Sequence, residues 1–261
     1  MKSGETSLNK YISSSGFCSR READKLIEQA RVTVNGELVL PGAKVSVGDK
    51  VAIDDEPIKT SKKQPVYIAF NKPVGVTSTT DQKDKTNIIS FIGHPKRIFP
   101  IGRLDKDSDG LIFLTNDGDI VNKILRASNN HEKEYIVTVD KALTPEFTRQ
   151  MSSGIPIQGT MTRKCFVKQE GGRRFRIILT QGLNRQIRRM CEYLGYNVVS
   201  LTRVRIMNVL LGNLPLGKWR YFTAPEIDKM ERMVAQSNKE EDLQNAAAGK
   251  PPKPKNDRYI R

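Results

Sequence analysis

The chain has 261 residues, 37% hydrophobic and 28% charged, which suits a globular protein with one large core and a second, smaller one. No apolar run approaches the roughly 18 residues of a membrane-spanning helix, and the first residues lack a secretory signal. We therefore expect a cytoplasmic protein with no membrane partner. Three widely spaced cysteines without a CxxC pair, and only two histidines, argue against a disulfide framework, a structural zinc site and a Ser-His or Cys-His hydrolase.

The net charge of +15 is unevenly distributed along the chain. Residues 163–220 carry 13 basic and two acidic side chains, so this segment alone contributes +11. It also shows strand-like and helix-like apolar patterning, which places the charge on a folded surface. A polyanion, most simply a nucleic acid, is the expected partner.

The first 60 residues form a small unit in this interpretation. Apolar residues at helical spacing within residues 8–12 and 23–27 predict two short helices, and Ser19 with Glu22 predicts a capping box for the second. Alternating apolar residues then predict short strands, with a hairpin turn at Asn35-Gly36. Residues 54–65 are polar and end in proline, which is typical of a linker.

A larger domain is expected over residues 65–232. Apolar runs predict strands at residues 66–70, 110–115, 134–140, 175–180 and 197–211. Helical spacing predicts helices at residues 119–127, 145–154 and 184–195. These elements do not alternate regularly, so we expect an α+β domain with a mixed or antiparallel sheet and flanking helices. Residues 235–261 lack an apolar period and are expected to be a disordered basic tail.

Residues 102–110, GRLDKDSDG, are the densest group of candidate functional residues. Acids at alternate positions followed by glycine resemble a calcium loop, but Asn116 stands where such a loop needs a bidentate glutamate, and no helix precedes it. We therefore expect no metal. Asp107 and Asp109 could instead accept hydrogen bonds from turn amides.

Residues 182–190 place three arginines at the entry to a predicted helix. Arg185, Arg188 and Arg189 are spaced to share one helix face, which is either a solvated basic face or a phosphate-binding one. The neighbouring sequence has few acids, which favours phosphate binding.

These motifs together resemble a known family. Residues 18–23 (CSRREA) and 32–36 (VTVNG) are similar to the small S4-type RNA-binding module. Residues 71–75 (NKPVG), 102–105 (GRLD), 133–135 (KEY) and 185–189 (RQIRR) resemble the successive motifs of the RsuA-type RNA pseudouridine synthases, most like the RluF branch that modifies large-subunit ribosomal RNA. The resemblance spans residues 8 to about 230.

The resemblance implies an isomerase that converts uridine to pseudouridine without a cofactor. It assigns Asp105 as the essential catalytic carboxylate and Arg188 as its ion-pair partner, which would favour the ionised carboxylate. Tyr135 would lie over a flipped uracil, although a strand tyrosine packed in the core would give the same sequence.

The resemblance also implies residues that contact RNA. Those expected at backbone phosphates, bases or the flipped nucleotide are Arg103, Leu104, Lys106, Arg185, Gln186, Ile187 and Arg189, with Arg20 and Arg21 in the small domain. The expected substrate is a stem-loop of 23S ribosomal RNA bound by a monomer, and transfer RNA stays open as a second substrate. The alternative is a non-catalytic RNA-binding or ribosome-assembly factor.

Overall fold

The computed structural model describes residues 5–58, 64–126 and 130–247, with side chains up to residue 236. The chain divides into two compact units, Met1–Pro65 and Val66–Arg261, and each is described by itself. Among the described residues, no helix combines the length and the apolar composition needed to cross a membrane.

The small unit packs two helices, α1 (Leu8–Ser15) and α2 (Arg20–Glu28), on short strands. The strands are β1 (Thr6–Ser7), β2 (Val32–Val34), β3 (Glu37–Leu38), β4 (Lys44–Val45), β5 (Val51–Ile53) and β6 (Glu56–Pro57). The capping box predicted at α2 is present: the Ser19 hydroxyl accepts from the Glu22 amide, and the Glu22 carboxylate accepts from the Ser19 amide. The Asn35-Gly36 turn has both residues at positive φ, as a two-residue hairpin requires.

Part of the expected linker is folded. Asp54 and Asp55 both adopt positive φ, so the chain turns back at once and β6 pairs with β5. Asp54 also forms an ion pair with Arg31 at 2.5 Å. Residues 54–57 therefore belong to the small unit, and the prediction of a linker was wrong there; residues 59–63 lie outside the described residues.

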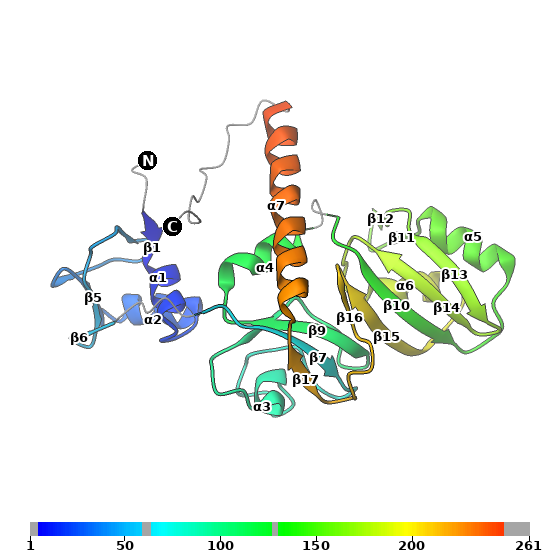
Figure 1. Ribbon diagram of the computed structural model, residues 1–261, viewed down its shortest axis with the longest axis horizontal. Helices are drawn as coiled ribbons and strands as arrows, with labels where there is room; N and C mark the ends of the chain where they lie inside the picture. The colour runs from blue at the N-terminus through cyan, green and yellow to red at the C-terminus, as the bar shows by residue number, and fades with distance from the viewer. Residues whose placement is uncertain (1–4, 59–63, 127–129, 248–261) are drawn as a thin grey trace. The chain divides into compact units, whose positions relative to one another are not determined.

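The large unit is an α+β domain built on one mixed sheet, as predicted (Figure 1). Its sheet follows the order β13-β14-β10-β15-β9-β7-β17, with β8 and β16 paired at the side. The strands are β7 (Tyr67–Lys72), β8 (Phe99–Ile101), β9 (Asp109–Thr115), β10 (Lys133–Val139), β13 (Phe166–Gly171), β14 (Arg174–Leu179), β15 (Val198–Ile206), β16 (Val209–Leu210) and β17 (Trp219–Tyr221), and a separate hairpin joins β11 (Pro156–Ile157) to β12 (Thr160–Met161). The helices are α3 (Ile88–Ile92), α4 (Gly118–Leu125), α5 (Pro145–Ser153), α6 (Gln186–Tyr193) and α7 (Ala224–Ala247).

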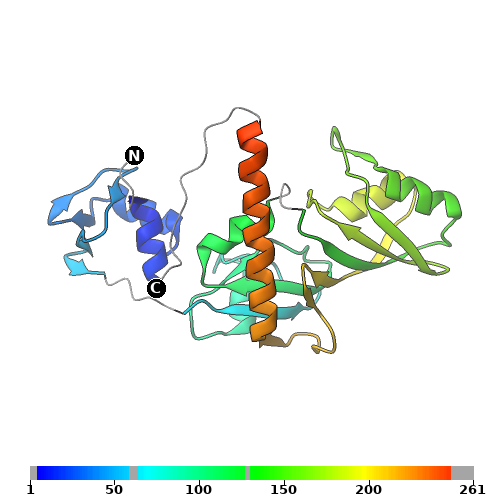
Figure 2. The same ribbon diagram turned by 45° about the horizontal axis from the view of Figure 1, so that its top comes forward.

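Alternating side chains of the central strands build a core on each face of the sheet. In β9, Ile112 and Leu114 join one core while Leu111 and Phe113 join the other. The first core is covered by α3, α5 and α6, and the second by α4 and α7, which lie beside each other in both views (Figure 2). Continuous apolar runs in β7 and β9 follow from this burial on both faces.

The two halves of the sheet meet at a short parallel pairing. Only two residue pairs join β9 to β15 within the described sheet, Asp109 with Thr202 and Gly110 with Arg203. A Cβ atom at Gly110 would lie 2.3 Å from the Arg203 carbonyl oxygen, so glycine is needed for this approach. Residues 102–108 immediately precede this junction.

Helix α7 contradicts part of the predicted tail. It continues to Ala247, so residues 235–247 are helical and not disordered, while residues 248–261 lie outside the described residues. Its first turns bury Met230 and Val234 in the second core. The following sequence is rich in glutamate, lysine, glutamine and alanine, which propagate a helix once packing has nucleated it.

Candidate active site

The loop of residues 102–108 joins β8 to β9 and carries Asp105. The Ser78 hydroxyl donates to the Leu104 carbonyl at 2.7 Å and accepts from the Leu104 amide at 3.2 Å. The Gly75 amide donates to the Lys106 carbonyl at 2.8 Å. The backbone is thus fixed on both sides of Asp105, whose side chain remains 33% exposed. This arrangement presents a carboxylate in a defined position to a ligand.

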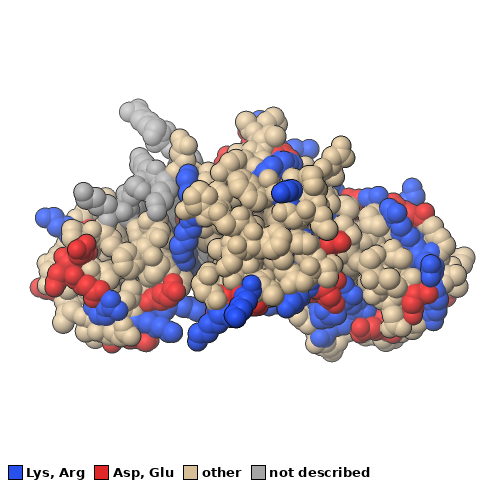
Figure 3. Space-filling view, turned by 90° about the horizontal axis from the view of Figure 1, so that it is seen from below, with Lys and Arg blue, Asp and Glu red and all other residues tan. Residues whose placement is uncertain are grey.

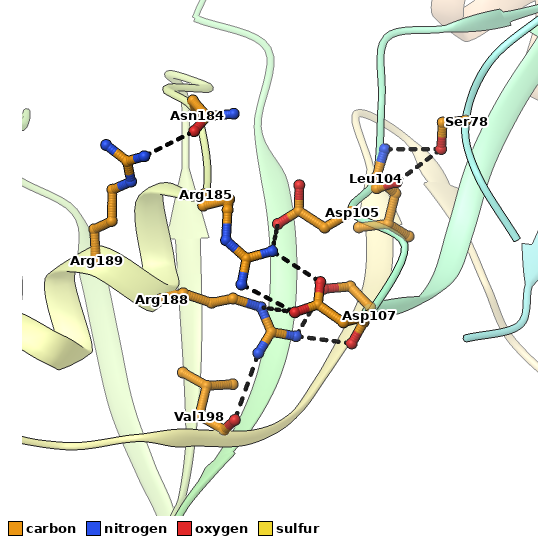
Figure 4. A network of polar contacts seen from close by, with 10 residues as sticks. Ser78, Leu104, Asp105, Asp107, Asn184, Arg185, Arg188, Arg189 and Val198 are labelled. Carbon is orange, nitrogen blue, oxygen red and sulfur yellow. Dashed lines mark hydrogen bonds and ion pairs between the residues drawn. The ribbon is translucent and has the colours of Figure 1, made fainter. Parts of the chain in front are cut away.

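Arg185 connects α6 to this loop (Figure 4). Its guanidinium donates two hydrogen bonds of 3.0 Å to the Asp107 carboxylate, and its Nη1 lies 3.8 Å from Asp105 Oδ2. The Arg185 hydrogen bonds are the main reason that the pKa of Asp107 lies below its usual value. Arg185 caps α6 in a left-handed conformation with φ of 49°, which is unusual for a residue other than glycine or asparagine.

Arg188 contacts the turn that follows Asp105. It is buried, and its Nη2 donates to the Asp107 carbonyl at 2.8 Å and to the Ser108 hydroxyl at 3.1 Å. Its Nε lies 3.4 Å from the Asp107 carboxylate. The expected ion pair of Arg188 with Asp105 was therefore wrong: Arg185 is the arginine that approaches Asp105, and Arg188 holds the loop.

The three arginines do not share one helix face, contrary to the prediction. Arg185 precedes the first helical residue and has left-handed backbone, so helical spacing does not apply to it. Arg188 points to the loop, whereas Arg189 donates to Asn184 on the other side (Figure 4).

Tyr135 lies on β10 and reaches the loop through Arg203. Arg203 is 4% exposed; it donates to the Leu111 carbonyl at 2.6 Å and to the Arg103 carbonyl at 3.4 Å. Its guanidinium carbon lies 5.9 Å from the centre of the Tyr135 ring. Tyr135 is partly buried against the first core, so it combines core packing with an accessible part. Arg203 was not predicted as a site residue, because in the sequence it is one of 13 basic residues in segment 163–220 and nothing distinguishes it from the others.

Three residues expected to contact RNA are buried. Leu104 and Ile187 pack in the first core. Gln186 is 4% exposed, and its Oε1 accepts from the Leu183 amide. Each of these three side chains supports the loop or the helix from inside, and its contact with RNA stays a prediction. Arg103 and Lys106 are exposed, and Arg189 is half-buried. In the small unit, Arg20 and Arg21 are exposed at the start of α2.

A buried lysine lies below the loop and was missed as a charged group. Lys72 is 0% exposed, and its Nζ donates to the carbonyls of Pro73 at 2.9 Å and Val76 at 3.0 Å. Burial lowers the pKa of Lys72 to about 8, against the opposing effect of Asp109. The sequence marked residues 71–75 only as one of the motifs of the family resemblance, and the burial of Lys72 depends on the sheet, which the motif does not reveal.

The charge of segment 163–220 is partly neutralised by acids outside it. Arg176 and Arg205 both pair with Glu134 of β10, and Arg205 also pairs with Glu132. Lys and Arg side chains accordingly alternate with Asp and Glu over the part of the molecule formed by β10 to β15 (Figure 3). These acids lie close to the segment because β10 lies between β14 and β15 in the sheet.

The donor set offers little for a metal or for thiol chemistry. Within the described residues, no three His, Cys, Asp or Glu side chains gather as a metal site requires. Burial raises the pKa of Cys165 to about 11 and that of Cys191 to about 12, which disfavours a thiolate at neutral pH. The arrangement therefore centres on a carboxylate among guanidinium groups.

Comparison with known proteins identifies the family. The model of the RNA pseudouridylate synthases matches residues 66–193, and that of the S4 domain matches residues 6–51. The "Dual-specificity RNA pseudouridine synthase RluF" of Salmonella typhi is 58% identical over 236 residues, which cover 90% of this chain and 82% of that protein. The chain belongs to the RNA pseudouridylate synthase family.

Other synthases support the same assignment. The "Ribosomal large subunit pseudouridine synthase B" of Bacillus subtilis is 33% identical over 87% of this chain and 96% of its own. A crystal structure of a pseudouridylate synthase superposes with a TM-score of 0.64 at 30% identity, covering 86% of this chain and 99% of that one. The predicted family, the fold with its S4 module and the enzyme class are confirmed: the chain is an RNA pseudouridine synthase.

Proposed function

We propose that this synthase isomerises one uridine in a stem-loop of 23S ribosomal RNA, with Asp105 as the essential catalytic group. The observation that carries the proposal is the Asp105 carboxylate, held on a loop whose backbone is fixed on both sides and approached by the Arg185 guanidinium at 3.8 Å. A preorganised carboxylate with an adjacent cation suits covalent or acid–base chemistry at a sugar or base.

The reaction needs no redox partner or group donor. The bond from C1′ to N1 breaks, the uracil turns, and C1′ bonds to C5; the C5 proton leaves and N1 gains a proton, so the atoms balance. Asp105 serves either as the nucleophile at the sugar or the base, or as the group that removes a proton.

The remaining residues bind and orient the nucleotide in this proposal. Tyr135 stacks on the flipped uracil, and Arg203 behind it holds the ring near the loop. Arg103 and Lys106 extend from the loop to meet the RNA backbone. Arg188 keeps the turn after Asp105 in place.

The substrate assignment draws on the relatives' names. One relative is named for the ribosomal large subunit, and another is named dual-specificity. We accordingly propose 23S ribosomal RNA as the main substrate and transfer RNA as the second, both modified in the cytoplasm by a single copy of the chain. Arg20 and Arg21 of the S4 module bind phosphates of the same RNA.

Mapping pseudouridine along total RNA tests this function. Cells lacking the protein should lose the modification at one 23S position and one transfer RNA position, and the wild-type chain should restore both while Asp105→Asn restores neither. If no uridine changes but the purified protein still binds ribosomal RNA, the non-catalytic assembly factor is the better account.

A further inference from the structure

A shallow pocket beside the arginines of α6 has no assigned role. We propose that it binds the nucleotide next to the reacting uridine, with the base stacked on Tyr193 and the backbone phosphates on Arg185 and Arg189. This inference rests on the proposed function, because it needs an RNA whose uridine lies at Asp105.

The pocket lies between α6 and the β11–β12 hairpin and has a volume of about 450 Å³. That size falls within the range of small-ligand sites. Pro156 and Gln158 line it from the hairpin. Arg185 lines it from the N-cap of α6, and the helix itself contributes Arg189, Glu192 and Tyr193. Two cations against one acid give the pocket a positive balance, which suits a phosphodiester.

Arg185 joins the pocket to the loop of residues 102–108, because it lines the pocket and also lies beside Asp105 and Asp107. Arg189 and Tyr193 line the pocket as well, and they are four residues apart on α6, so they share one face of that helix. An RNA strand leaving the uridine site along α6 meets the two guanidinium groups first and the aromatic ring last.

Tyr193 has the properties of a stacking residue. The residue is 60% exposed, and its side chain makes no ring contact or hydrogen bond within the part of the chain that the structure describes. Arg189 has one side-chain contact there, from Nη2 to Asn184, so its remaining N–H groups can reach phosphate. Exposed aromatic rings beside cations are the usual platform for unpaired bases.

Binding of stem-loop RNAs to the chain carrying Asp105→Asn tests the pocket without turnover. The RNAs are intact or abasic at single positions flanking the uridine. Tyr193→Ala should weaken binding of the intact RNA about five- to 150-fold, and Tyr193→Phe should not. Removing the base at one of these positions should lower the RNA affinity of the Asp105→Asn chain by a similar factor. The same abasic RNA should bind the chain that also carries Tyr193→Ala no more weakly than the intact RNA does.

Two further variants keep the test decisive. Phe166 is a similarly exposed aromatic residue, at 52% against 60% for Tyr193. Its neighbour Val167 packs against the core that α6 covers, so Phe166 lies on the opposite face of the sheet. Phe166→Ala should therefore bind the RNA normally. Glu192→Gln should tighten binding at low salt, because it removes the acid beside the phosphates. The proposed pocket is contradicted if Tyr193→Ala binds the intact RNA normally, or if Tyr193→Ala lowers the affinity for intact RNA and for every abasic RNA by the same factor. Either result counts even if the wild-type enzyme forms pseudouridine. The proposed function fails separately, if the wild-type enzyme forms none.

Discussion

The Nη2 atom of Arg188 lies 2.8 Å from the carbonyl oxygen of Asp107, and this hydrogen bond links α6 to the turn after Asp105. The two residues are 81 positions apart in sequence, so the contact fixes the loop against a different layer of the fold. Arg188 therefore helps to fix the position of Asp105 indirectly, because it holds the residues that follow Asp105 in the loop.

Removing this link should destabilise the protein as well as the site. Arg188→Met leaves the Asp107 carbonyl and the Ser108 hydroxyl without their buried donor, which costs about 1–3 kcal/mol. Urea unfolding monitored by circular dichroism measures the loss. Arg189→Met on the same helix should change the free energy of unfolding by less than about 0.5 kcal/mol; equal losses would contradict the assigned role of Arg188.

Two substitutions at Arg185 should separate the effect of backbone strain on stability from the effect of the guanidinium on turnover. Asparagine tolerates the left-handed φ of 49°, and Arg185→Asn removes only half-exposed ion pairs. The free energy of unfolding should therefore change by less than about 1 kcal/mol, while the rate of turnover falls. Arg185→Val removes the same charge but should destabilise by about 1–3 kcal/mol, because a branched side chain resists this φ. Thermal unfolding and single-turnover rates measure the two effects. Unchanged turnover in Arg185→Asn would exclude a role for this guanidinium beside Asp105.

Lys72 should make stability rise at alkaline pH. Its pKa is about 8 in the folded protein and near 10.5 when unfolded, so between these values the unfolded chain binds more protons. The free energy of unfolding should therefore increase from pH 8 to 10.5, and the penalty of the buried charge is fully present below pH 8. Urea titrations across this range measure the slope. Lys72→Met should reduce it but not abolish it, because burial lowers the pKa of Lys133 to about 8 as well; an unchanged slope would count against the buried charge.

Salt dependence should distinguish the RNA-facing side of the loop. Lys106 is exposed next to Asp105, so Lys106→Ala should reduce the slope of log affinity against log salt by about 0.7–0.9. Filter binding over a series of salt concentrations gives the slope. Lys168 is exposed on β13 and its neighbour Val167 packs in the core, so Lys168→Ala should keep the wild-type slope. If Lys168→Ala reduces the slope of log affinity against log salt and Lys106→Ala does not, the RNA binds the face of the sheet that carries Lys168 and not the loop.

Local chemistry made much of the fold predictable from sequence. The Ser19–Glu22 capping box, the Asn35-Gly36 turn and the apolar runs of β7 and β9 depend on neighbours within a few residues. Strand β13 was not predicted, because an edge strand of polar residues has no apolar alternation and is defined by its pairing with β14. Helix α7 was not predicted, because its first turns depend on tertiary packing of Met230 and Val234 in the second core.

The site was predictable only at the level of motifs. The family resemblance located Asp105, but partner choice between Arg185 and Arg188 depends on the left-handed backbone at Arg185, which no spacing rule reveals. The neutralisation of Arg176 and Arg205 by Glu134 likewise depends on the order of strands in the sheet. Contacts between distant segments are therefore the part that sequence reasoning could not supply.

The most direct measurement compares single-turnover pseudouridine formation by Asp105→Asn and Asp107→Asn on one stem-loop RNA, with RNA affinity measured in parallel. Both substitutions remove one carboxylate charge near Arg185, so they are matched in charge and position. We predict that Asp105→Asn loses at least about 100-fold in rate with little change in affinity, whereas Asp107→Asn retains turnover. Turnover near the wild-type rate in Asp105→Asn would contradict the account.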